Sequence, residues 1–361
     1  MIEHLKFDCR YFRGHIPCTP NKLRNKVCNA CDEYSPITKK ILIIKLGAIG
    51  DVIRTTPLVV RFRKLYPDCH ITWVTHSPDV LPTDQVDVIV RLEFASIYAV
   101  QNQQFDIAIN LDKETEACSL LKDVNANEKY GFTWENFHIA LATPNAEHKL
   151  ITGLFDNISK TNTKNYLEEI FEICHLTFEG EPYLLNYNQE LAKKWQSIRT
   201  KADGKKIVGL NTGCGKRWQT RLWPDDYWVK LISMLKDGGF YPVLLGGSDE
   251  HDKNTSLTYK THAYYPGHYS LQEFISLTSN CDLIVTQVSM MMHIAIGLKK
   301  PMVLMNNIFN KHEFELYGNG VIVEPNSGCD CYYGNTCKRD KPCMNDLSPE
   351  KIFNHIENLL K

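Results

Sequence analysis

Asp51 has the position and chemistry expected of a general base. It ends the run LGAIGD (residues 46–51), which follows the apolar stretch ILII at residues 41–44. Gly47 and Gly50 permit a tight turn and close approach of a ligand to the backbone. A carboxylate within hydrogen-bond reach can take the proton of a sugar hydroxyl, which is otherwise a poor nucleophile. The competing interpretation is that Asp51 only caps the helix that starts here.

A second candidate group combines glycines with cations in the run NTGCGKRWQTRLWP (residues 211–224). Thr212 and Gly213 begin a loop after an apolar stretch, and three cations follow, at Lys216, Arg217 and Arg221. Backbone amides and cations of this kind can hold a diphosphate and neutralise charge as a bond to it breaks. The alternative is a solvated basic loop.

A third group lies at residues 282–298, where the apolar stretch DLIVTQ runs into SMMMHIAIGL. Ser289 and Met290 fall in the first turn of the expected helix, whose free amides suit phosphate, and His293 follows one turn later. The three methionines at 290–292 are also typical of packing. In LLGGSDE (residues 244–250), Glu250 can accept hydrogen bonds from a nucleotide ribose, or can be an ordinary residue of a first helical turn.

Eight of the thirteen cysteines form two clusters. The first contains a CxxC pair, which favours a metal because the turn points both thiolates at one ion. The second has less regular spacing. We expect structural zinc, or alternatively iron or an iron–sulfur cluster, and no catalytic metal, because four thiolates leave no open position and no Asp-x-Asp motif ends a strand. The clusters are Cys9, Cys18, Cys28, Cys31 and Cys329, Cys331, Cys337, Cys343.

Short apolar runs alternate with amphipathic stretches in two series, which predicts two α/β domains with parallel sheets. The expected strands lie at 41–46, 70–76, 86–92, 105–111, 206–213, 241–248, 282–287 and 301–307, and the expected helices at 58–66, 165–176, 225–239, 271–280, 289–298 and 348–360. We expect a cysteine-rich extension at 1–38, domains at 39–202 and 203–347 with a linker near 202–206, and a closing helix at 348–361 capped by Ser348.

The amino-acid composition indicates which broad class of protein the chain belongs to. The chain has 361 residues, of which 43% are hydrophobic, 11% aromatic and 23% charged, values typical of globular proteins. A formal net charge of −1 argues against nucleic acid as a partner. No apolar run approaches the roughly 20 residues of a membrane span, and the N-terminus does not read as a signal peptide, so we expect a cytoplasmic protein.

The order and spacing of these motifs resemble the ADP-heptose–lipopolysaccharide heptosyltransferase family, glycosyltransferase family 9. The resemblance runs from ILIIKLGAIGDVIRTTPLV, with its Gly-Asp turn and Thr56-Pro57, to His293-Ile294-Ala295. It implies the GT-B fold, two Rossmann-like domains whose parallel sheets face each other across a cleft. It also implies that Asp51 is the base. The sequence departs from the family pattern at three positions. Val288 stands where the family has an acid, and Met290 lies near the position of the usual glycine. Arg221 takes the place of a lysine that the family carries immediately before the Trp-Pro pair.

The resemblance implies an inverting transfer of heptose or a related sugar from an ADP-type nucleotide donor to a hydroxyl of lipopolysaccharide or a related glycan. Donor-binding residues would be Thr212, Gly213, Lys216, Arg217, Arg221, Glu250, Ser289, Met290 and His293. Acceptor-binding residues would be Gly47, Gly50, Arg54 and Arg61. A heptosyltransferase branch of the family that acts on autotransporter proteins uses cysteine-bound iron.

The acceptor is a glycan, glycolipid or protein, and several alternatives stay open. Seven Lys and Arg and one acid lie between residues 39 and 64, a pattern that suits a solvated helix face or steering of a phosphorylated or membrane-held acceptor. Peripheral contact with the inner membrane is therefore an alternative to a freely cytoplasmic enzyme. Other hypotheses are a protein-acceptor transferase with another nucleotide sugar, a catalytically silent GT-B binding protein, and an iron–sulfur redox protein.

Overall fold

The first domain is built on a six-stranded sheet with strand order β3-β2-β1-β4-β5-β6. All neighbouring strands are parallel except the β5–β6 hairpin. The central strand β1 is apolar on both faces, so alternate residues pack into two separate cores, as a sheet covered on both sides requires. The strands are β1 (Lys39–Ile44), β2 (Cys69–Thr75), β3 (Val88–Arg91), β4 (Gln104–Asn110), β5 (Asn125–Glu135) and β6 (His138–Leu141).

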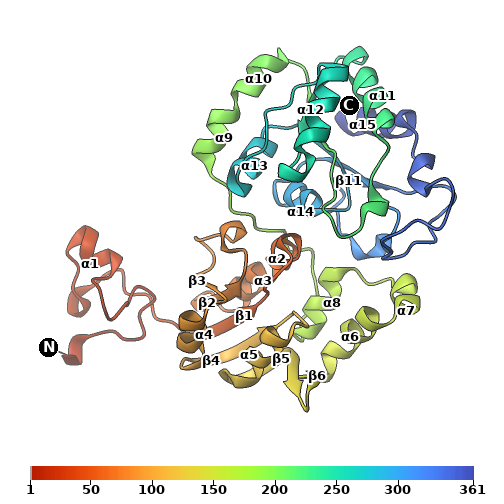
Figure 1. The fold of residues 1–361 in the computed structure, drawn as a ribbon. Helices are drawn as coiled ribbons and strands as arrows, with labels where there is room; N and C mark the ends of the chain where they lie inside the picture. Colours follow the sequence, from red (N-terminus) through yellow and green to blue (C-terminus); the bar gives the residue numbers. More distant parts are fainter. Residues whose placement is uncertain (1) are drawn as a thin grey trace.

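Helices flank this sheet in the computed structural model, which describes residues 2–361 (Figure 1). They are α2 (Ile49–Thr55), α3 (Pro57–Leu65), α4 (Phe94–Gln101), α5 (Thr115–Asp123), α6 (Glu147–Leu154), α7 (Asp156–Thr161) and α8 (Tyr166–Ile173), with short 3-10 turns η3 (Pro78–Val80) and η4 (Pro144–Ala146). Helix α8 begins with a capping box between Asn165 and Glu168. Helix α2 starts at the carboxyl end of β1, where parallel sheets place their ligand sites.

The second domain contains a five-stranded, fully parallel sheet with strand order β11-β10-β9-β7-β8. Its strands are β7 (Ile207–Asn211), β8 (Tyr241–Leu245), β9 (Leu283–Gln287), β10 (Met302–Met305) and β11 (Gly320–Val323). Its helices are α9 (Gln189–Trp195), α10 (Ser197–Ala202), α11 (Asp225–Asp237), α12 (His251–Thr261), α13 (Leu271–Thr278), α14 (Met290–Gly297) and α15 (Pro349–Leu360), with short turns η5 (Gln219–Arg221), η6 (Ser248–Glu250), η7 (Lys311–Glu313) and η8 (Cys343–Asp346).

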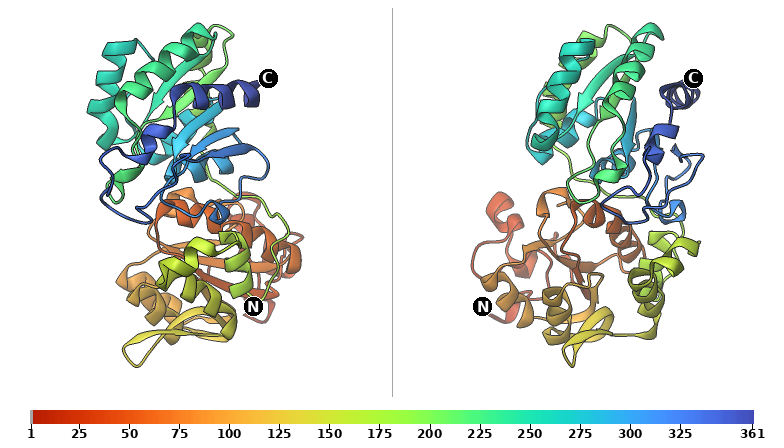
Figure 2. Two further views of the ribbon diagram at one scale, coloured as in Figure 1. Left: turned by 90° about the vertical axis from the view of Figure 1, so that its right-hand side faces the viewer. Right: turned by 45° about the vertical axis from the view of Figure 1, so that its right-hand side comes forward.

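The two domains stack end to end in Figure 2, and together they form the predicted GT-B architecture. The chain crosses between them earlier than the expected linker at 202–206. Helix α9 packs on α13, and Lys194 and Arg199 form ion pairs with Glu273 and Asp282 of the second domain. We therefore place the crossing in the irregular segment 174–188, upstream of α9.

Most of the expected elements are present. All eight predicted strands and all six predicted helices have counterparts, and the Ser348 hydroxyl accepts a hydrogen bond from the Lys351 amide as the cap of α15. Sequence reasoning missed β5, β6 and β11. Strand β5 carries Asn125, Asn127 and Glu128, exposed polar residues at the sheet's margin, so it lacks the apolar run that identified the others. None of the helices in residues 2–361 is both long and apolar enough to cross a bilayer.

Residues 2–38 form a small module at the side of the first domain, with η1 (Ile2–His4), α1 (Thr19–Arg24) and η2 (Cys28–Ala30) (Figure 1). Pro20 is its single buried residue among those described. Arg10 anchors the module, because its guanidinium pairs with Asp87 at 3.0 Å and donates to the Cys69 carbonyl at 2.9 Å. The module therefore has almost no apolar core of its own.

The basic residues of α3 do not form a free acceptor-binding face, which corrects the expectation for Arg61. The Arg61 side chain is buried, forms an ion pair with buried Glu181 and donates to the Thr177 carbonyl at 3.0 Å. Arg63 is likewise paired with Asp87 at 2.6 Å. Both cations brace α3 against its own domain, so they are not available to attract an anionic acceptor.

We expect Arg61→Ala to lower the free energy of unfolding by about 3–5 kcal/mol, because it leaves the Glu181 carboxylate buried without its partner. Lys64→Ala is the matched control, since Lys64 is 70% exposed and its pair with Glu179 should contribute less than about 1 kcal/mol. Urea unfolding of both variants measures the difference. Equal stability of the two variants would contradict the structural role of Arg61.

Candidate functional site

The turn after β1 is fixed by a buried ion pair that sequence reasoning missed. Lys45, 5% exposed, pairs with Asp112, which follows β4 and also accepts a hydrogen bond from the Leu46 amide. Because β1 and β4 are parallel neighbours, their carboxyl ends meet at one edge of the sheet. The sequence signal for this pair was available, because a lysine follows one apolar strand and an aspartate follows the other.

Asp51 lies in the first turn of α2, and its carboxylate pairs with the guanidinium of Arg54 at 2.8 Å. Burial alone would raise the pKa of Asp51, but the charges of Arg54 and then Lys45 outweigh it and hold the pKa below its usual value. The Asp51 side chain is still 33% exposed. It is therefore an ionised carboxylate that a ligand can reach.

Arg54 connects the two domains. Its guanidinium stacks on the ring of Tyr166, 3.4 Å from the centroid, and pairs with Glu313 of the second domain at 3.0 Å. The other oxygen of Glu313 accepts a hydrogen bond from the Tyr333 hydroxyl at 3.1 Å. A single cation thus contacts the candidate base and a carboxylate from across the domain boundary.

His293 brings α14 of the second domain against α2 of the first. A Cβ on Gly50 would lie only 2.5 Å from the imidazole Cδ2 of His293, so this contact requires glycine. The imidazole stacks on Tyr183, and its Nδ1 has no hydrogen-bond partner. Burial, and then the charge of Arg54, lower the pKa of His293 to about 3. The imidazole is therefore neutral at ordinary pH.

A cavity of about 450 Å³, here termed the strand-end cavity, opens beyond β7, β8 and β9. It is lined by the loops that follow β7 and β8, by the first turn of α14, and by Ile49 of the first domain. The Ser289 hydroxyl caps α14 by accepting from the Met291 amide. Glu250 packs so closely on Gly213 that a Cβ there would lie 2.0 Å from its Oε1.

The predicted donor-binding residues divide into those at this cavity and those elsewhere. Gly213, Glu250, Ser289 and Met290 line it. Lys216, 80% exposed, pairs at 3.0 Å with Asp249, which is a lining residue. Thr212 is buried and donates to Asn254, and His293 faces Gly50 and Tyr183. Sequence reasoning missed Asn211, Tyr269 and Phe274, of which Asn211 ends an apolar strand.

Arg221 has a different place from the one its motif suggested. It is 6% exposed, and its guanidinium donates to three backbone carbonyls, those of Trp218, Val288 and Cys214. It does not line the strand-end cavity. Arg221 therefore fixes the 214–218 loop against the turn before α14, rather than offering its charge to a diphosphate.

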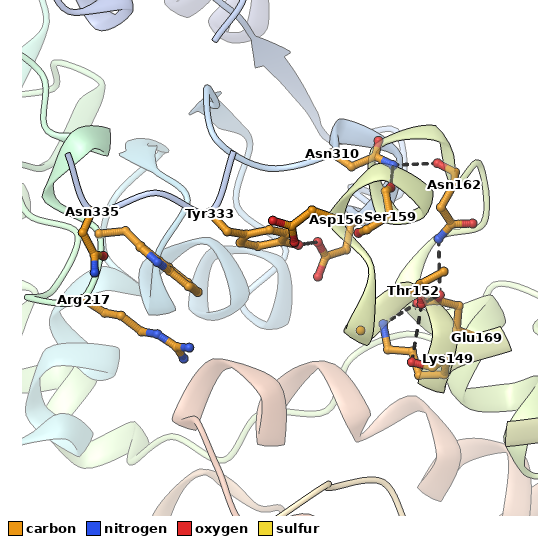
Figure 3. Close-up of a pocket in the computed structure, with 13 residues that line it drawn as sticks. Lys149, Thr152, Asp156, Ser159, Asn162, Glu169, Arg217, Asn310, Tyr333 and Asn335 are labelled. Carbon is orange, nitrogen blue, oxygen red and sulfur yellow. Dashed lines mark hydrogen bonds and ion pairs between the residues drawn. The ribbon is translucent and has the colours of Figure 1, made fainter. Parts of the chain in front are cut away.

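A second cavity of about 490 Å³, here termed the interdomain cavity, lies between helices α6 to α8 and loops of the second domain (Figure 3). The first domain contributes Lys149, Thr152, Gly153, Asp156, Ser159, Asn162 and Glu169. The second domain contributes Arg217, Trp218, Asn310, Glu313, Tyr333 and Asn335. Only Arg217 was predicted as a site residue, because the others come from distant segments without a shared motif.

Helix α2 stands between the two cavities. Ile49, near its start, lines the strand-end cavity, while Arg54, near its end, pairs with Glu313, which lines the interdomain cavity. Asp51 lies between these two residues in sequence, with Gly50 packed on His293. Gly47 has open space around it, since an added Cβ would meet no atom within 4 Å. The candidate base therefore lies within three residues of one side chain that lines the strand-end cavity and of another that pairs with a lining residue of the interdomain cavity, although it lines neither cavity itself.

The cysteines of both clusters carry free thiols. Cys9, Cys18, Cys28 and Cys31 all line one small cavity of about 30 Å³. In the second cluster a hydrogen bond between Cys329 and Cys343 lowers the pKa of Cys343 to about 6. Within residues 2–361, no three His, Cys, Asp or Glu side chains are gathered in a way that could hold an ion.

Comparison with known proteins gives a consistent result. Residues 94–323 match the family model described as glycosyltransferase family 9 (heptosyltransferase). Lipooligosaccharide heptosyltransferase 2 of Haemophilus influenzae is 22% identical over 298 residues, which are 73% of this chain and 82% of that protein. The chain also matches two solved structures in fold.

A glycosyl transferase family 9 protein from Veillonella parvula has a TM-score of 0.69 and 18% identity, covering 90% of this chain and 97% of that one. The E. coli ADP-heptose lipopolysaccharide heptosyltransferase II has a TM-score of 0.65 and 16% identity, covering 89% and 98%. At such identities these structures establish the fold.

We expect the His293 imidazole to stay neutral from pH 8 down to about pH 5, well below the roughly 6.5 of a free histidine, because it is buried beside Arg54. Ring carbon shifts in an NMR titration measure this, with the signal assigned by its loss in a folded His293→Gln variant. A midpoint between pH 6 and 7 for that signal would show that the imidazole is not enclosed by the two domains.

Proposed function

This chain belongs to glycosyltransferase family 9, the heptosyltransferase family, and on that premise we propose that it transfers heptose or a related sugar from an ADP-type donor to an acceptor hydroxyl, with inversion. The acceptor belongs to lipopolysaccharide or a related surface glycan. The names of the relatives support the sugar and the nucleotide, since they include a lipooligosaccharide heptosyltransferase and an ADP-heptose enzyme.

The single observation that carries the mechanism is the ionised, partly exposed Asp51 carboxylate on the helix between the two cavities. Asp51 takes the proton of the acceptor hydroxyl as its oxygen attacks the anomeric carbon. The bond from that carbon to the diphosphate oxygen breaks, and ADP leaves with the electron pair. One displacement inverts the anomeric centre and needs no covalent intermediate on the protein.

The strand-end cavity suits the nucleotide. At the first turn of α14 the Met291 and Met292 amides donate to Ser289, which orders the turn and leaves the Met290 amide to receive a phosphate oxygen. Glu250 lines the same cavity, where its carboxylate can accept hydrogen bonds from ribose hydroxyls. Lys216 lies at the rim beside Asp249 and offers a mobile cation to the leaving diphosphate. No metal ion is needed in this scheme.

A catalytically silent binding protein is the second candidate. It is motivated by Val288, which stands where the family resemblance implies an acid and is 6% exposed in this chain. A valine there cannot hydrogen-bond a donor sugar through its side chain, although the Val288 carbonyl still anchors Arg221. The two candidates differ in one respect, the turnover of a donor.

We further propose that the first cysteine cluster takes up a structural zinc or iron ion, which would draw together thiols that the described residues do not gather closely enough to hold one. Four thiols line one cavity of about 30 Å³, and none of them makes a hydrogen bond in the described residues. The module has almost no buried apolar side chains, so an ion would supply folding energy that the module otherwise lacks. For the second cluster the support is the contact of Cys329 with Cys343.

We place the reaction in the cytoplasm, with peripheral contact at the inner membrane for a lipid-linked acceptor. The N-terminal module supports such contact, because several of its apolar side chains are exposed in a segment that also carries six basic residues. The exposed aliphatic and phenylalanine side chains are Ile2, Leu5, Phe7, Ile16, Leu23 and Val27.

Asp51→Asn should lower kcat/KM for transfer from ADP-heptose by about 10²- to 10⁴-fold, the usual contribution of a general base. Because Asp51 lines neither cavity directly, the affinity for ADP should stay close to that of the wild type. Asp226→Asn, an exposed aspartate at the start of α11, is the control and should keep full activity. Mass spectrometry of the transfer product measures the rates.

Transfer by Asp51→Asn at the wild-type rate would refute the role of this carboxylate. If wild type and variant both bind ADP and neither consumes any ADP-sugar in a donor panel, the silent binding protein is the correct interpretation.

The purified full chain should contain about one zinc or iron ion bound at the first cysteine cluster. The Cys28→Ser variant should lack that ion and should have a lower melting temperature than the wild type. Cys174→Ser, which removes a buried thiol far from the cluster in sequence, is the control and should keep the metal. Inductively coupled plasma mass spectrometry measures the content. Metal-free protein, or equal metal in Cys28→Ser, would contradict the assignment.

A further inference from the structure

We infer that the interdomain cavity binds the acceptor through a neutral, hydroxyl-rich sugar rather than through a phosphate or carboxylate group. This inference rests on the proposed transfer reaction and specifies the chemical class of its acceptor. It differs from the expectation that basic residues after Asp51 attract an anionic acceptor.

The charges around the cavity are almost fully paired within the protein. Lys149 pairs with Glu169, which is 2% exposed on its side chain, and Glu313 pairs with Arg54. The two arginines of α3, Arg61 and Arg63, are committed to Glu181 and Asp87. An acceptor phosphate would therefore have to displace an existing ion pair in order to gain a cation, which is costly where the partner is buried.

Two charged lining residues remain without an ion pair, and they have opposite signs. Arg217 and Asp156 form no salt bridge among the described residues, and both are exposed at the cavity. Arg217 lies over Trp218, 4.3 Å from the ring centroid. One free cation and one free carboxylate give the cavity no net preference for an anion, while both can hydrogen-bond sugar hydroxyls.

The remaining lining groups are those that suit a sugar. In Figure 3, Arg217 and Asn335 lie on one side of the cavity, opposite Thr152, Asn162, Glu169 and Lys149. The rings of Trp218 and Tyr333, with centroids 5.6 Å apart, both line the cavity, so the part of their surface that Arg217 and the neighbouring rings leave uncovered can contact the apolar side of a pyranose. The rest of the lining is mostly polar, as binding of many hydroxyl groups requires, and about 490 Å³ is within the usual size of small-molecule sites.

The cavity is also adjacent to the candidate base. Glu313 lines it, pairs with Arg54 at 3.0 Å, and Arg54 pairs with Asp51 at 2.8 Å. A sugar held against Trp218 and Tyr333 therefore lies in a cavity linked to Asp51 through Glu313 and Arg54, while Ile49 of the same helix lines the strand-end cavity. This is the arrangement that a transfer between two bound substrates requires.

Saturation-transfer NMR on the full chain tests the inference without a donor. The probes are methyl glycosides of neutral hexoses and heptoses, with their phosphate and uronate counterparts. Neutral glycosides should bind, and raising the NaCl concentration to about 0.5 M should not weaken their binding, because salt screens only interactions between charges. Trp218→Ala should weaken binding about tenfold or more through loss of the aromatic face. Trp134→Ala, a partly buried tryptophan on β5 outside the cavity, should not.

Tighter, salt-sensitive binding of the phosphate or uronate probes would overturn the inference, as would binding that Trp218→Ala and Trp134→Ala affect equally, or no binding of any neutral glycoside. Different results would refute the proposed transfer reaction. A chain that binds neutral glycosides here but consumes no ADP-heptose refutes the transfer, whereas one that transfers heptose only to anionic acceptors refutes this inference alone.

Discussion

The guanidinium of Arg54 is the group on which the site depends. It stacks on Tyr166, pairs with Asp51 and Glu313, and lies at the boundary where α2 of the first domain meets the second domain. A buried cation needs such compensation, because removing its charge from water costs several kcal/mol. The ion pair with Arg54 keeps Asp51 ionised. Because Arg54 also pairs with Glu313 of the second domain, the position of Asp51 depends on the contact between the domains. The candidate base therefore has its charged, oriented form when the two domains are together.

The sequence predicted those parts of the fold that depend on local pattern. Strand ILII, the Gly-Asp turn and the Ser348-capped helix are each specified by residues within one short segment. Pairing of charges across the chain is not local. Arg61 meets Glu181, 120 positions away, and Arg54 meets Glu313, 259 positions away, so neither partner was recognisable from spacing. The place of Arg221 was missed for a similar reason, since one of the carbonyls that bind it belongs to Val288, 67 positions away.

The ion pairs of Arg54, Arg61 and Arg63 also change which acceptor we expect. A basic stretch after Asp51 suggested an anionic acceptor, but in the folded chain its arginines are neutralised by acids from other segments. What remains open beside α2 is a polar cavity with aromatic walls and nearly balanced charge on one side, and a cavity beyond the strand ends on the other. Donor and acceptor can then be distinguished by chemistry, with phosphate-binding amides on one side and hydroxyl-binding side chains on the other.

The central claim is that Asp51 lies between two bound substrates. The most direct measurement is an experimental structure of the full chain with a non-transferable ADP-heptose analogue and a neutral glycan acceptor. The account predicts the diphosphate at the first turn of α14 and an acceptor hydroxyl within about 3 Å of an Asp51 oxygen, which is hydrogen-bond distance. A nucleotide bound outside the strand-end cavity, or an Asp51 carboxylate directed away from both ligands, would contradict it.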